Sequence, residues 1–221
     1  MFLGLGLGAM EQLGIPGEGA AGVIDALRFI AEYKTYRGAR VGRRVVVVGG
    51  GNTAIDIAVQ SRRLGAEDVT IVYRRGPDEM SATIDEREFA QVNGAKIKYW
   101  ARPVRISGSD GQVQAIEFEY TRLDDQGRLT GTGERFSLAA DMVFKAIGQL
   151  FLPDPLNKDA QQPLQLHGNR IAINSEHATS LPGVFAGGDC VATGHELTVQ
   201  AVQDGKLAAE GIDRFLKSKS R

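Results

Sequence analysis

The chain alternates between short apolar runs and longer amphipathic segments, and this order predicts an α/β fold. Val45–Val48 is a continuous β-branched run without the polar alternation of a strand that faces water. Such a run is typical of a central parallel strand covered on both faces. A helical segment at 53–64 and a strand at 69–73 follow, which together give a βαβ unit. A helix near 84–92 and a strand near 96–100 continue the alternation.

The pattern on either side of this unit is less regular. Residues 2–7 predict a short buried strand, and residues 23–36 carry apolar positions at helical spacing. Residues 104–138 contain short alternating segments around a polar turn, which predicts a small antiparallel meander. Met142–Gly148 returns to a buried strand that ends in glycine, and a final helix is expected at 197–216.

Composition and charge exclude several classes of function. The 221 residues carry a formal net charge of -1, and no basic run predicts binding to nucleic acid or to a membrane surface. The apolar start at 1–8 is far too short to span a membrane. Because the chain opens within such an apolar element, we expect the whole chain to be a piece of a longer protein. Cys190 is the single cysteine, so no internal disulfide can form. This cysteine usage favours a reducing compartment, and we expect a cytoplasmic protein.

The run at 45–48 leads into a glycine-rich turn that then opens a helix. Gly49, Gly51 and Ala54 give a G-x-G-x-x-A pattern in the strand–turn–helix setting that a dinucleotide site requires. Gly49 permits the tight turn, Gly51 lets the backbone approach a pyrophosphate, and Ala54 lets the helix pack closely. The alternative is a plain tight turn in a parallel sheet. The predicted binding residues are Gly49, Gly50, Gly51, Asn52, Thr53 and Ala54.

The end of the second strand indicates which nucleotide binds. An NAD site usually places a carboxylate there, which accepts hydrogen bonds from the ribose 2′-hydroxyl, but this strand ends in Arg74 and Arg75. Two guanidinium groups bind a 2′-phosphate through charge-assisted hydrogen bonds, whereas a carboxylate would repel it. We therefore expect NADPH rather than NADH. The alternative is that these arginines only solvate the end of a strand.

A second glycine turn lies near the carboxyl end of the chain. Val184–Ala186 is a short buried strand, followed by Gly187, Gly188 and Asp189 and then by a helix. This segment resembles the C-terminal flavin motif of flavoprotein oxidoreductases with two dinucleotide-binding domains. The resemblance implies that Asp189 binds a hydroxyl of FAD and that amides at the helix start face the flavin; the alternative role of Asp189 is to form the turn. Those amides belong to Glu196, Leu197 and Thr198.

The resemblance extends over nearly the whole chain. Residues 2–8 resemble the exit from the FAD domain, and 45–75 resemble the inserted NADPH domain. Ala146, Ile147 and Gly148 resemble the cofactor-binding segment where the chain returns. Within the family, the chain is most similar to glutamate synthase small subunits and to the flavin modules of dihydropyrimidine dehydrogenase.

The resemblance implies an α/β fold with two domains, one of them partial. The first is a Rossmann-like NADPH-binding domain, made of a parallel sheet and the small antiparallel meander. The second is a partial FAD-binding α/β domain. The connector 38–44, rich in glycine and arginine, is interpreted as a domain crossing. The expected segments are 1–37 and 145–221 for the FAD-binding domain and 38–144 for the NAD(P)H-binding domain.

In the reaction that the resemblance implies, NADPH reduces FAD, and the electrons pass to a partner subunit. That partner would resemble the glutamate synthase large subunit or a pyrimidine dehydrogenase; a homodimer is a further option. The protein positions the two rings and excludes water, so we expect no catalytic side chain and no metal site.

Two departures from the family pattern leave a second hypothesis open. No first FAD fingerprint precedes Phe2, and the cysteine-rich iron–sulfur region of the subfamily has no counterpart. The alternative function is therefore a nucleotide-binding fragment or sensor module without turnover.

Overall fold

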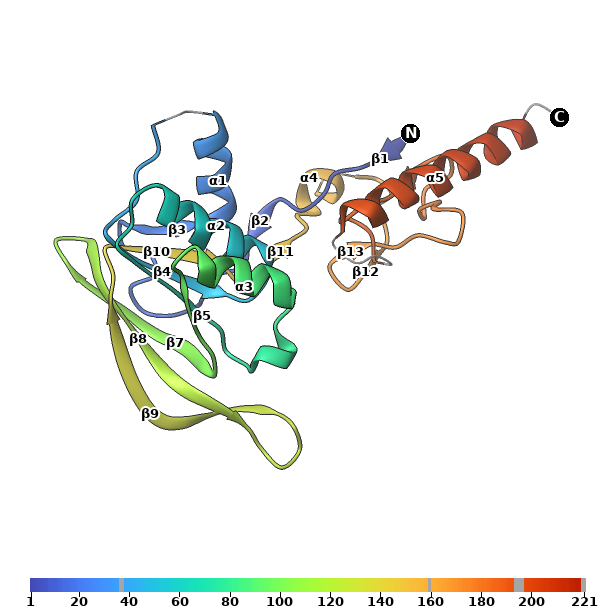
Figure 1. Ribbon diagram of the computed structural model, residues 1–221. Helices are drawn as coiled ribbons and strands as arrows, with labels where there is room; N and C mark the ends of the chain where they lie inside the picture. Colours follow the sequence, from blue (N-terminus) through green and yellow to red (C-terminus); the bar gives the residue numbers. More distant parts are fainter. Residues whose placement is uncertain (36–37, 159, 193–196, 220–221) are drawn as a thin grey trace. The chain divides into compact units, whose positions relative to one another are not determined.

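The computed structural model divides the chain into two compact units (Figure 1). Unit 1 comprises Met1–Ala9 and Gln149–Arg221, and unit 2 comprises Met10–Gly148. Residues 10–37, which the sequence grouped with the FAD-binding segments, lie within unit 2. The structure describes residues 1–35, 38–158, 160–192 and 197–219.

Unit 2 is built on a five-stranded sheet whose strands are all parallel. The strand order is β3-β10-β4-β5-β6, so β4 lies at the centre and pairs with both β10 and β5. This arrangement confirms the central, two-sided strand predicted from the valine run. In sheet order the strands are β3 (Val23–Asp25), β10 (Met142–Ala146), β4 (Arg44–Gly49), β5 (Asp68–Val72) and β6 (Lys96–Lys98).

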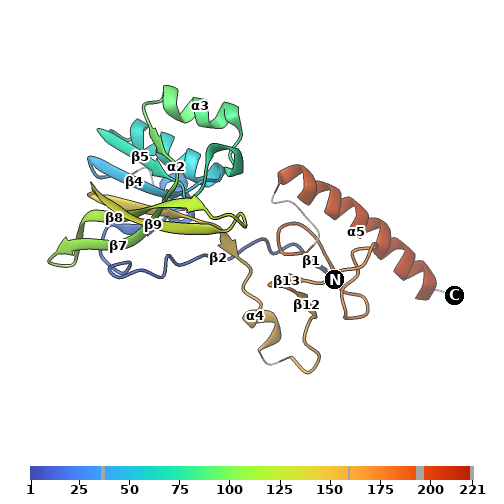
Figure 2. The same cartoon turned by 90° about the horizontal axis from the view of Figure 1, so that it is seen from below.

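Helices cover one face of this sheet and an antiparallel meander covers the other, so unit 2 has three layers (Figure 2). The meander has the strand order β7-β8-β9 and is the one expected from the alternating pattern. A short 3₁₀ turn follows β5 at Pro77–Glu79. The helices are α1 (Ala26–Thr35), α2 (Asn52–Arg63) and α3 (Ile84–Val92), and the meander strands are β7 (Ala101–Ser109), β8 (Gln112–Leu123) and β9 (Leu129–Ala139).

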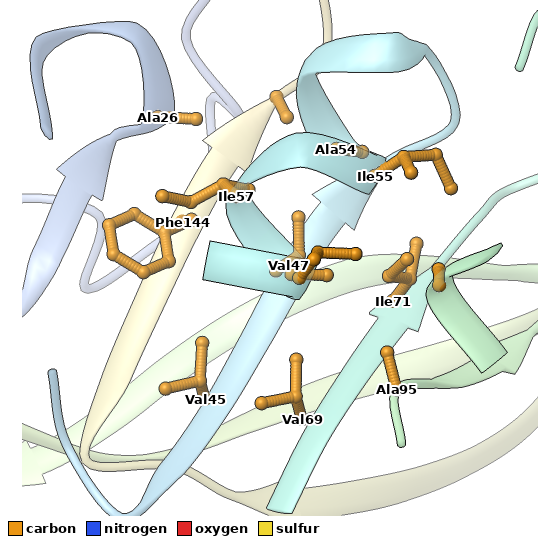
Figure 3. Packing of buried hydrophobic residues seen from close by; sticks show 14 of the residues in the cluster. Ala26, Val45, Val47, Ala54, Ile55, Ile57, Val69, Ile71, Ala95 and Phe144 are labelled. Carbon is orange, nitrogen blue, oxygen red and sulfur yellow. The ribbon is translucent and has the colours of Figure 1, made fainter. Parts of the chain in front are cut away.

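The two faces of β4 bury separate hydrophobic cores. Val45 and Val47 pack among residues of α1 and α2 (Figure 3). Val46 and Val48 pack against the meander. Burying one such side chain contributes about 1.5–3 kcal/mol to folding. The unbroken valine run therefore stabilises both layers at once and fixes where β4 ends and its glycine turn begins.

Two sequence predictions for the first segment were wrong. Residues 23–25 form strand β3 rather than the start of a helix, because Val23 and Ile24 pair with Val143 and Phe144 of β10. Adjacent apolar residues fit either element, and long-range pairing decided the outcome. The strand predicted at 2–7 is limited to β1 (Phe2–Leu3).

Unit 1 contains a parallel pair, β1 and β14 (Phe185–Ala186), and the long helix α5 (Thr198–Lys219). Its core gathers Phe151, Ile171 and Val191 with the buried Cys190. No helix among the described residues is both long and apolar enough to cross a membrane. The other elements of unit 1 are α4 (Asp154–Asn157), β12 (Leu166–His167) and β13 (Arg170–Ile171).

The chain enters and leaves unit 2 through neighbouring residues. The backbone N–H of Glu11 donates to the carbonyl of Gly148 at 3.1 Å. Strands β2 (Ala9–Met10) and β11 (Gln149–Leu150) form a two-stranded sheet where the chain passes between the units.

Candidate functional site

The glycine turn after β4 has the backbone that its sequence predicted. Gly49 adopts φ +147, and a Cβ at this position would overlap the carbonyl oxygen of Ala146. A side chain on Gly50 would overlap the ring of Tyr73. Only glycine fits at these two positions, because the neighbouring strands approach the turn so closely.

Gly51 differs from its neighbours because the space beside it is open. Its φ of -99 is ordinary, and the nearest atom to an added Cβ would be the Ser81 hydroxyl at 3.4 Å. Gly51 is therefore not required by the packing of the chain itself. A glycine that the fold does not need, at the start of a helix, marks a place where a ligand approaches the backbone.

Helix α2 presents unpaired donors at this turn. The carbonyl of Gly51 accepts from the N–H groups of Ala54 and Ile55. Within the described part of the chain, the N–H groups of Gly51, Asn52 and Thr53 have no hydrogen-bond partner. Unpaired amides at the positive end of the helix dipole bind phosphate oxygens. Ala54 is fully buried, which is the close helix packing that the motif requires.

Arg74 and Arg75 follow β5, the strand beside β4. Arg74 is exposed and Arg75 is half-buried. Neither guanidinium forms an ion pair or hydrogen bond with any residue that the structure describes. Two arginines at the opposite end of the sheet behave differently: Arg43 pairs with Glu67 and Arg44 pairs with Asp141. The two cations beside the glycine turn are therefore available to an anionic ligand.

The return segment lies on the other side of the glycine turn. Ala146 ends β10 and is the register partner of Gly49. Ile147 packs partly against the core beneath the meander, and Gly148 is exposed with φ +126. The structure therefore brings the predicted segments after β10, β4 and β5 to adjacent strand ends of one sheet. The carboxyl edge beside a change in strand order is where open α/β sheets bind nucleotides.

The second turn, in unit 1, presents a carboxylate. Gly188 has φ +77, and Asp189 follows it with a half-buried side chain. The Asp189 carboxylate has no hydrogen bond or ion pair with the residues that the structure describes. Its backbone carbonyl accepts from the guanidinium of Arg170 at 2.7 Å. Among the described residues, the Asp189 carboxylate therefore has no partner, while its backbone is held by Arg170.

Helix α5 begins close to this turn. A Cβ on Gly188 would lie 3.7 Å from the Cβ of Ala201, one turn into the helix. Leu197 and Thr198 are exposed at the helix start. Glu196, the remaining predicted residue of this group, lies outside the described residues.

Sequence reasoning missed Asp204. This residue lies in α5 and is 1% exposed, although a lone carboxylate inside a helix is rarely buried. It accepts from the Gly188 N–H at 2.9 Å and from the Gln200 side-chain amide at 2.7 Å. The only signal in the sequence was an acidic residue one position before a helical glycine, which by itself does not indicate burial.

A buried ion cluster lies behind the end of β10. The ammonium of Lys145 lies 3.1 Å from Glu18 and 3.0 Å from Asp25. Burial alone would lower the pKa of Lys145, but hydrogen bonds and attraction from Asp25 and Glu18 raise it. Burial likewise opposes ionisation of Glu18, yet amide donors and Lys145 hold its pKa below the usual value. Both groups stay charged, and their ion pair connects the first segment of unit 2 to strand β10, which ends at Ala146.

The sequence of the chain matches a known protein family over most of its length. Residues 2–205 match the model of the family described as pyridine nucleotide-disulphide oxidoreductase. The NADP(+)-dependent formate dehydrogenase subunit beta of Moorella thermoacetica is 34% identical, over 98% of this chain and 32% of that protein. The glutamate synthase [NADPH] small chain of Escherichia coli is 33% identical, over 98% of this chain and 50% of that protein. The chain thus spans about a third to a half of these relatives.

Solved structures show the same fold. FprA from Mycobacterium tuberculosis in complex with NADPH superposes with a TM-score of 0.78 at 21% identity, covering 99% of this chain and 64% of that one. Thioredoxin reductase from T. acidophilum gives a TM-score of 0.74 at 22% identity, covering 98% and 65%. At these identities the likeness establishes the fold, and it agrees with the α/β, Rossmann-type expectation.

Proposed function

Because the chain belongs to the pyridine nucleotide-disulphide oxidoreductase family, we propose that it is the NADPH-binding part of a flavoprotein oxidoreductase. The observation that carries the proposal is that two sets of donors without a partner among the described residues follow adjacent strands. They are the amides at Gly51–Thr53 after β4 and the guanidiniums of Arg74 and Arg75 after β5. The amides suit a diphosphate, and the guanidiniums suit a further phosphate. NADPH carries both groups.

In this proposal unit 2 holds NADPH. The turn from Gly49 to Ala54 binds the pyrophosphate, and the open side of Gly51 lets the phosphate oxygens approach the backbone. Arg74 and Arg75 bind the 2′-phosphate. Ala146, Ile147 and Gly148 flank the nucleotide from the neighbouring strand, where β10 pairs with β4.

Unit 1 contributes to the FAD site. The carboxylate of Asp189, which has no partner among the described residues, would accept a hydrogen bond from a hydroxyl of the flavin side chain. Gly188 keeps the turn narrow, and amides at Leu197 and Thr198 face the flavin at the helix start. FAD, if held there, would supply the acceptor for the hydride of NADPH, which would be oxidised to NADP⁺. The residues of this chain bind and orient the two groups, and none of them forms a covalent bond.

The electrons then pass to a partner subunit, in line with relatives named as subunits or chains of glutamate synthase and formate dehydrogenase. We infer a protein acceptor similar to the glutamate synthase large subunit or to a pyrimidine dehydrogenase. A homodimer is compatible with the proposal. We also infer a cytoplasmic location, because Cys190 is buried and the chain has no second cysteine with which it could form an internal disulfide.

Titration with NADP⁺ and NAD⁺ tests the nucleotide assignment, because binding requires no turnover. We expect NADP⁺ to bind more tightly than NAD⁺ in isothermal calorimetry. Arg74→Glu should weaken NADP⁺ binding by about 10- to 100-fold, since a charge-assisted bond contributes about 1.5–3 kcal/mol, and leave NAD⁺ binding nearly unchanged. Arg63→Glu makes the same charge change at the far end of α2 and should preserve the preference. Equal losses for both nucleotides with Arg74→Glu would contradict the 2′-phosphate assignment.

The visible absorbance of the purified chain and its reduction of a dye test the flavin assignment. A purified chain with flavin absorbance that reduces a dye with NADPH would support electron input by this chain. A colourless chain that still binds NADP⁺ would support the nucleotide-binding module without turnover.

A further inference from the structure

The loop that carries Arg74 and Arg75 is held by hydrogen bonds to its backbone carbonyl groups. Three consecutive carbonyl groups, those of Tyr73, Arg74 and Arg75, each accept one hydrogen bond. None of the donors belongs to the parallel sheet. They are the N–H of Ala101 to Tyr73 at 3.1 Å, the hydroxyl of Thr121 to Arg74 at 2.7 Å, and the N–H of Trp100 to Arg75 at 3.1 Å.

Thr121 supplies the only side-chain donor of the three. It lies on β8 and is 5% exposed, so it is largely shielded from bulk water. Its own N–H donates to the carbonyl of Trp100 at 2.9 Å, which ties the loop and the strand end together. A valine has nearly the same shape as threonine but no hydroxyl, so it would leave the Arg74 carbonyl without a donor.

An irregularity in the meander lies next to Thr121. The pairing of β8 with β9 shifts between Glu119 and Thr121, where β9 carries extra residues around Gly133. Such bulges redirect individual side chains. Glu119 stabilises the shift, because its carboxylate accepts from the Gly133 N–H at 3.0 Å and from Arg102. Thr121 lies at the end of this shift, and its hydroxyl donates to the Arg74 carbonyl in the loop after β5, which belongs to the other sheet.

We propose that Thr121 determines coenzyme choice by holding the backbone of Arg74 so that its guanidinium faces the 2′-phosphate. This inference rests on the proposed function. Thr121 is a positioning residue, since it acts through Arg74. The cost of ordering a long arginine side chain falls when its backbone is already fixed, so the hydrogen bond strengthens phosphate binding without touching the ligand. NAD⁺, which lacks that phosphate, gains nothing from it.

The test is the ratio of dissociation constants for NADP⁺ and NAD⁺, measured on the full chain. Trp100 is the only tryptophan and adjoins the loop, so its fluorescence provides a second signal of binding. Thr121→Val should reduce the preference for NADP⁺ by about five- to twentyfold, as expected for the loss of one buried hydrogen bond. NAD⁺ affinity should remain within about twofold, and Thr121→Ser should restore the preference.

Thr130→Val is the matched control. Its hydroxyl also donates to an arginine carbonyl, that of Arg122 at 3.3 Å, but it lies at the solvent end of the meander. It should leave the ratio unchanged. If Thr121→Val does not fold, Thr121→Ala makes the same deletion without the added methyl group.

The outcomes separate the two proposals. If the wild-type chain shows no preference for NADP⁺, the proposed function fails. If Arg74→Glu abolishes the preference but Thr121→Val keeps it, the proposed function stands and the role of Thr121 is refuted. Equal weakening of both nucleotides by Thr121→Val would also refute it, because that result indicates only structural damage.

Discussion

The carboxylate of Asp204 accepts a hydrogen bond from the backbone N–H of Gly188 at 2.9 Å, from beneath the turn that carries Asp189. Its second oxygen accepts from the side chain of Gln200. A Cβ on Gly187 would lie 2.9 Å from that of Asp204, so the helix and the turn are in direct contact. The turn of the proposed flavin site is thus fixed by α5 below and by Arg170 at the Asp189 carbonyl.

We therefore predict that Asp204→Ala destabilises unit 1. The change leaves the Gly188 N–H without an acceptor and should lower the free energy of unfolding by about 1–3 kcal/mol. Urea unfolding followed by far-UV circular dichroism measures this. Asp213→Ala, on the exposed face of the same helix, removes only a surface ion pair with Lys217 and should cost less than about 1 kcal/mol. Similar losses in the two variants would show that the buried contact has no special role.

The glycine turn after β4 offers a test that separates folding from binding. Gly51→Ala should fold normally, because its φ is ordinary and the nearest atom would be 3.4 Å away. It should weaken NADP⁺ binding by about tenfold or more, since a methyl group stands where the phosphate approaches. Calorimetric titration and a thermal melt measure the two effects. Undiminished affinity would remove this turn from the site.

Gly49→Ala is the contrasting variant at the same turn. Its φ of +147 and its approach to the Ala146 carbonyl leave no room for a methyl group. We expect a loss of about 1–3 kcal/mol or more in unfolding free energy, from overpacking in addition to backbone strain. A melting temperature equal to that of the wild type would contradict the close approach of Gly49 to Ala146.

Lys145 should be one of the most sensitive charged positions in unit 2. Lys145→Met leaves Glu18 and Asp25 without their shared cation, and removing one partner of a buried pair costs about 3–5 kcal/mol. Urea unfolding followed by Trp100 fluorescence reports on this unit. Lys96→Met is the control, because its pair with Asp68 is exposed and should contribute less than about 1 kcal/mol.

The same cluster predicts a dependence of stability on acid. The pKa of Glu18 is lowered in the folded state, so its contribution is complete above the ordinary value of 4.5 and is lost as the pH falls below it. The pKa of Lys145 is raised, so its contribution is lost only above about 10.5. Between about pH 6 and about pH 9 this pair should therefore add no pH dependence. Glu18→Gln should flatten part of the acid-side loss in urea midpoints measured from about pH 7 to about pH 3.5; an unchanged slope would contradict the assignment.

The sequence predicted those parts of the fold that depend on local pattern. The valine run, the glycine turn and the helix after it are consecutive, so their spacing alone indicates a βαβ unit with a nucleotide turn. Strand β3 escaped prediction because Val23 and Ile24 become a strand only by pairing with β10, more than a hundred residues later. No local pattern contains that information.

The residues of the candidate site likewise fall into those that the sequence predicted and those that it did not. Gly51, Arg74 and Asp189 were identified from their place after strands. The Gly51 N–H, the Arg74 guanidinium and the Asp189 carboxylate have no partner among the described residues. Thr121 and Asp204 could not be identified, because each acts on a loop distant in the chain. Their roles depend on hydrogen bonds between separate elements and on burial, which arise only when the whole unit is assembled.

The hydrogen bond between Glu11 and Gly148 has a consequence for how such a protein can be re-engineered. Because the 139-residue stretch from Met10 to Gly148 starts and finishes at adjacent points, it has the form of a removable cassette. Exchanging this stretch between relatives would transplant nucleotide preference as one block, with only two splice points to match. Such an exchange would transfer Thr121 and Arg74 together. The hydrogen bond between them would therefore be kept along with the nucleotide preference of the protein that supplied the stretch.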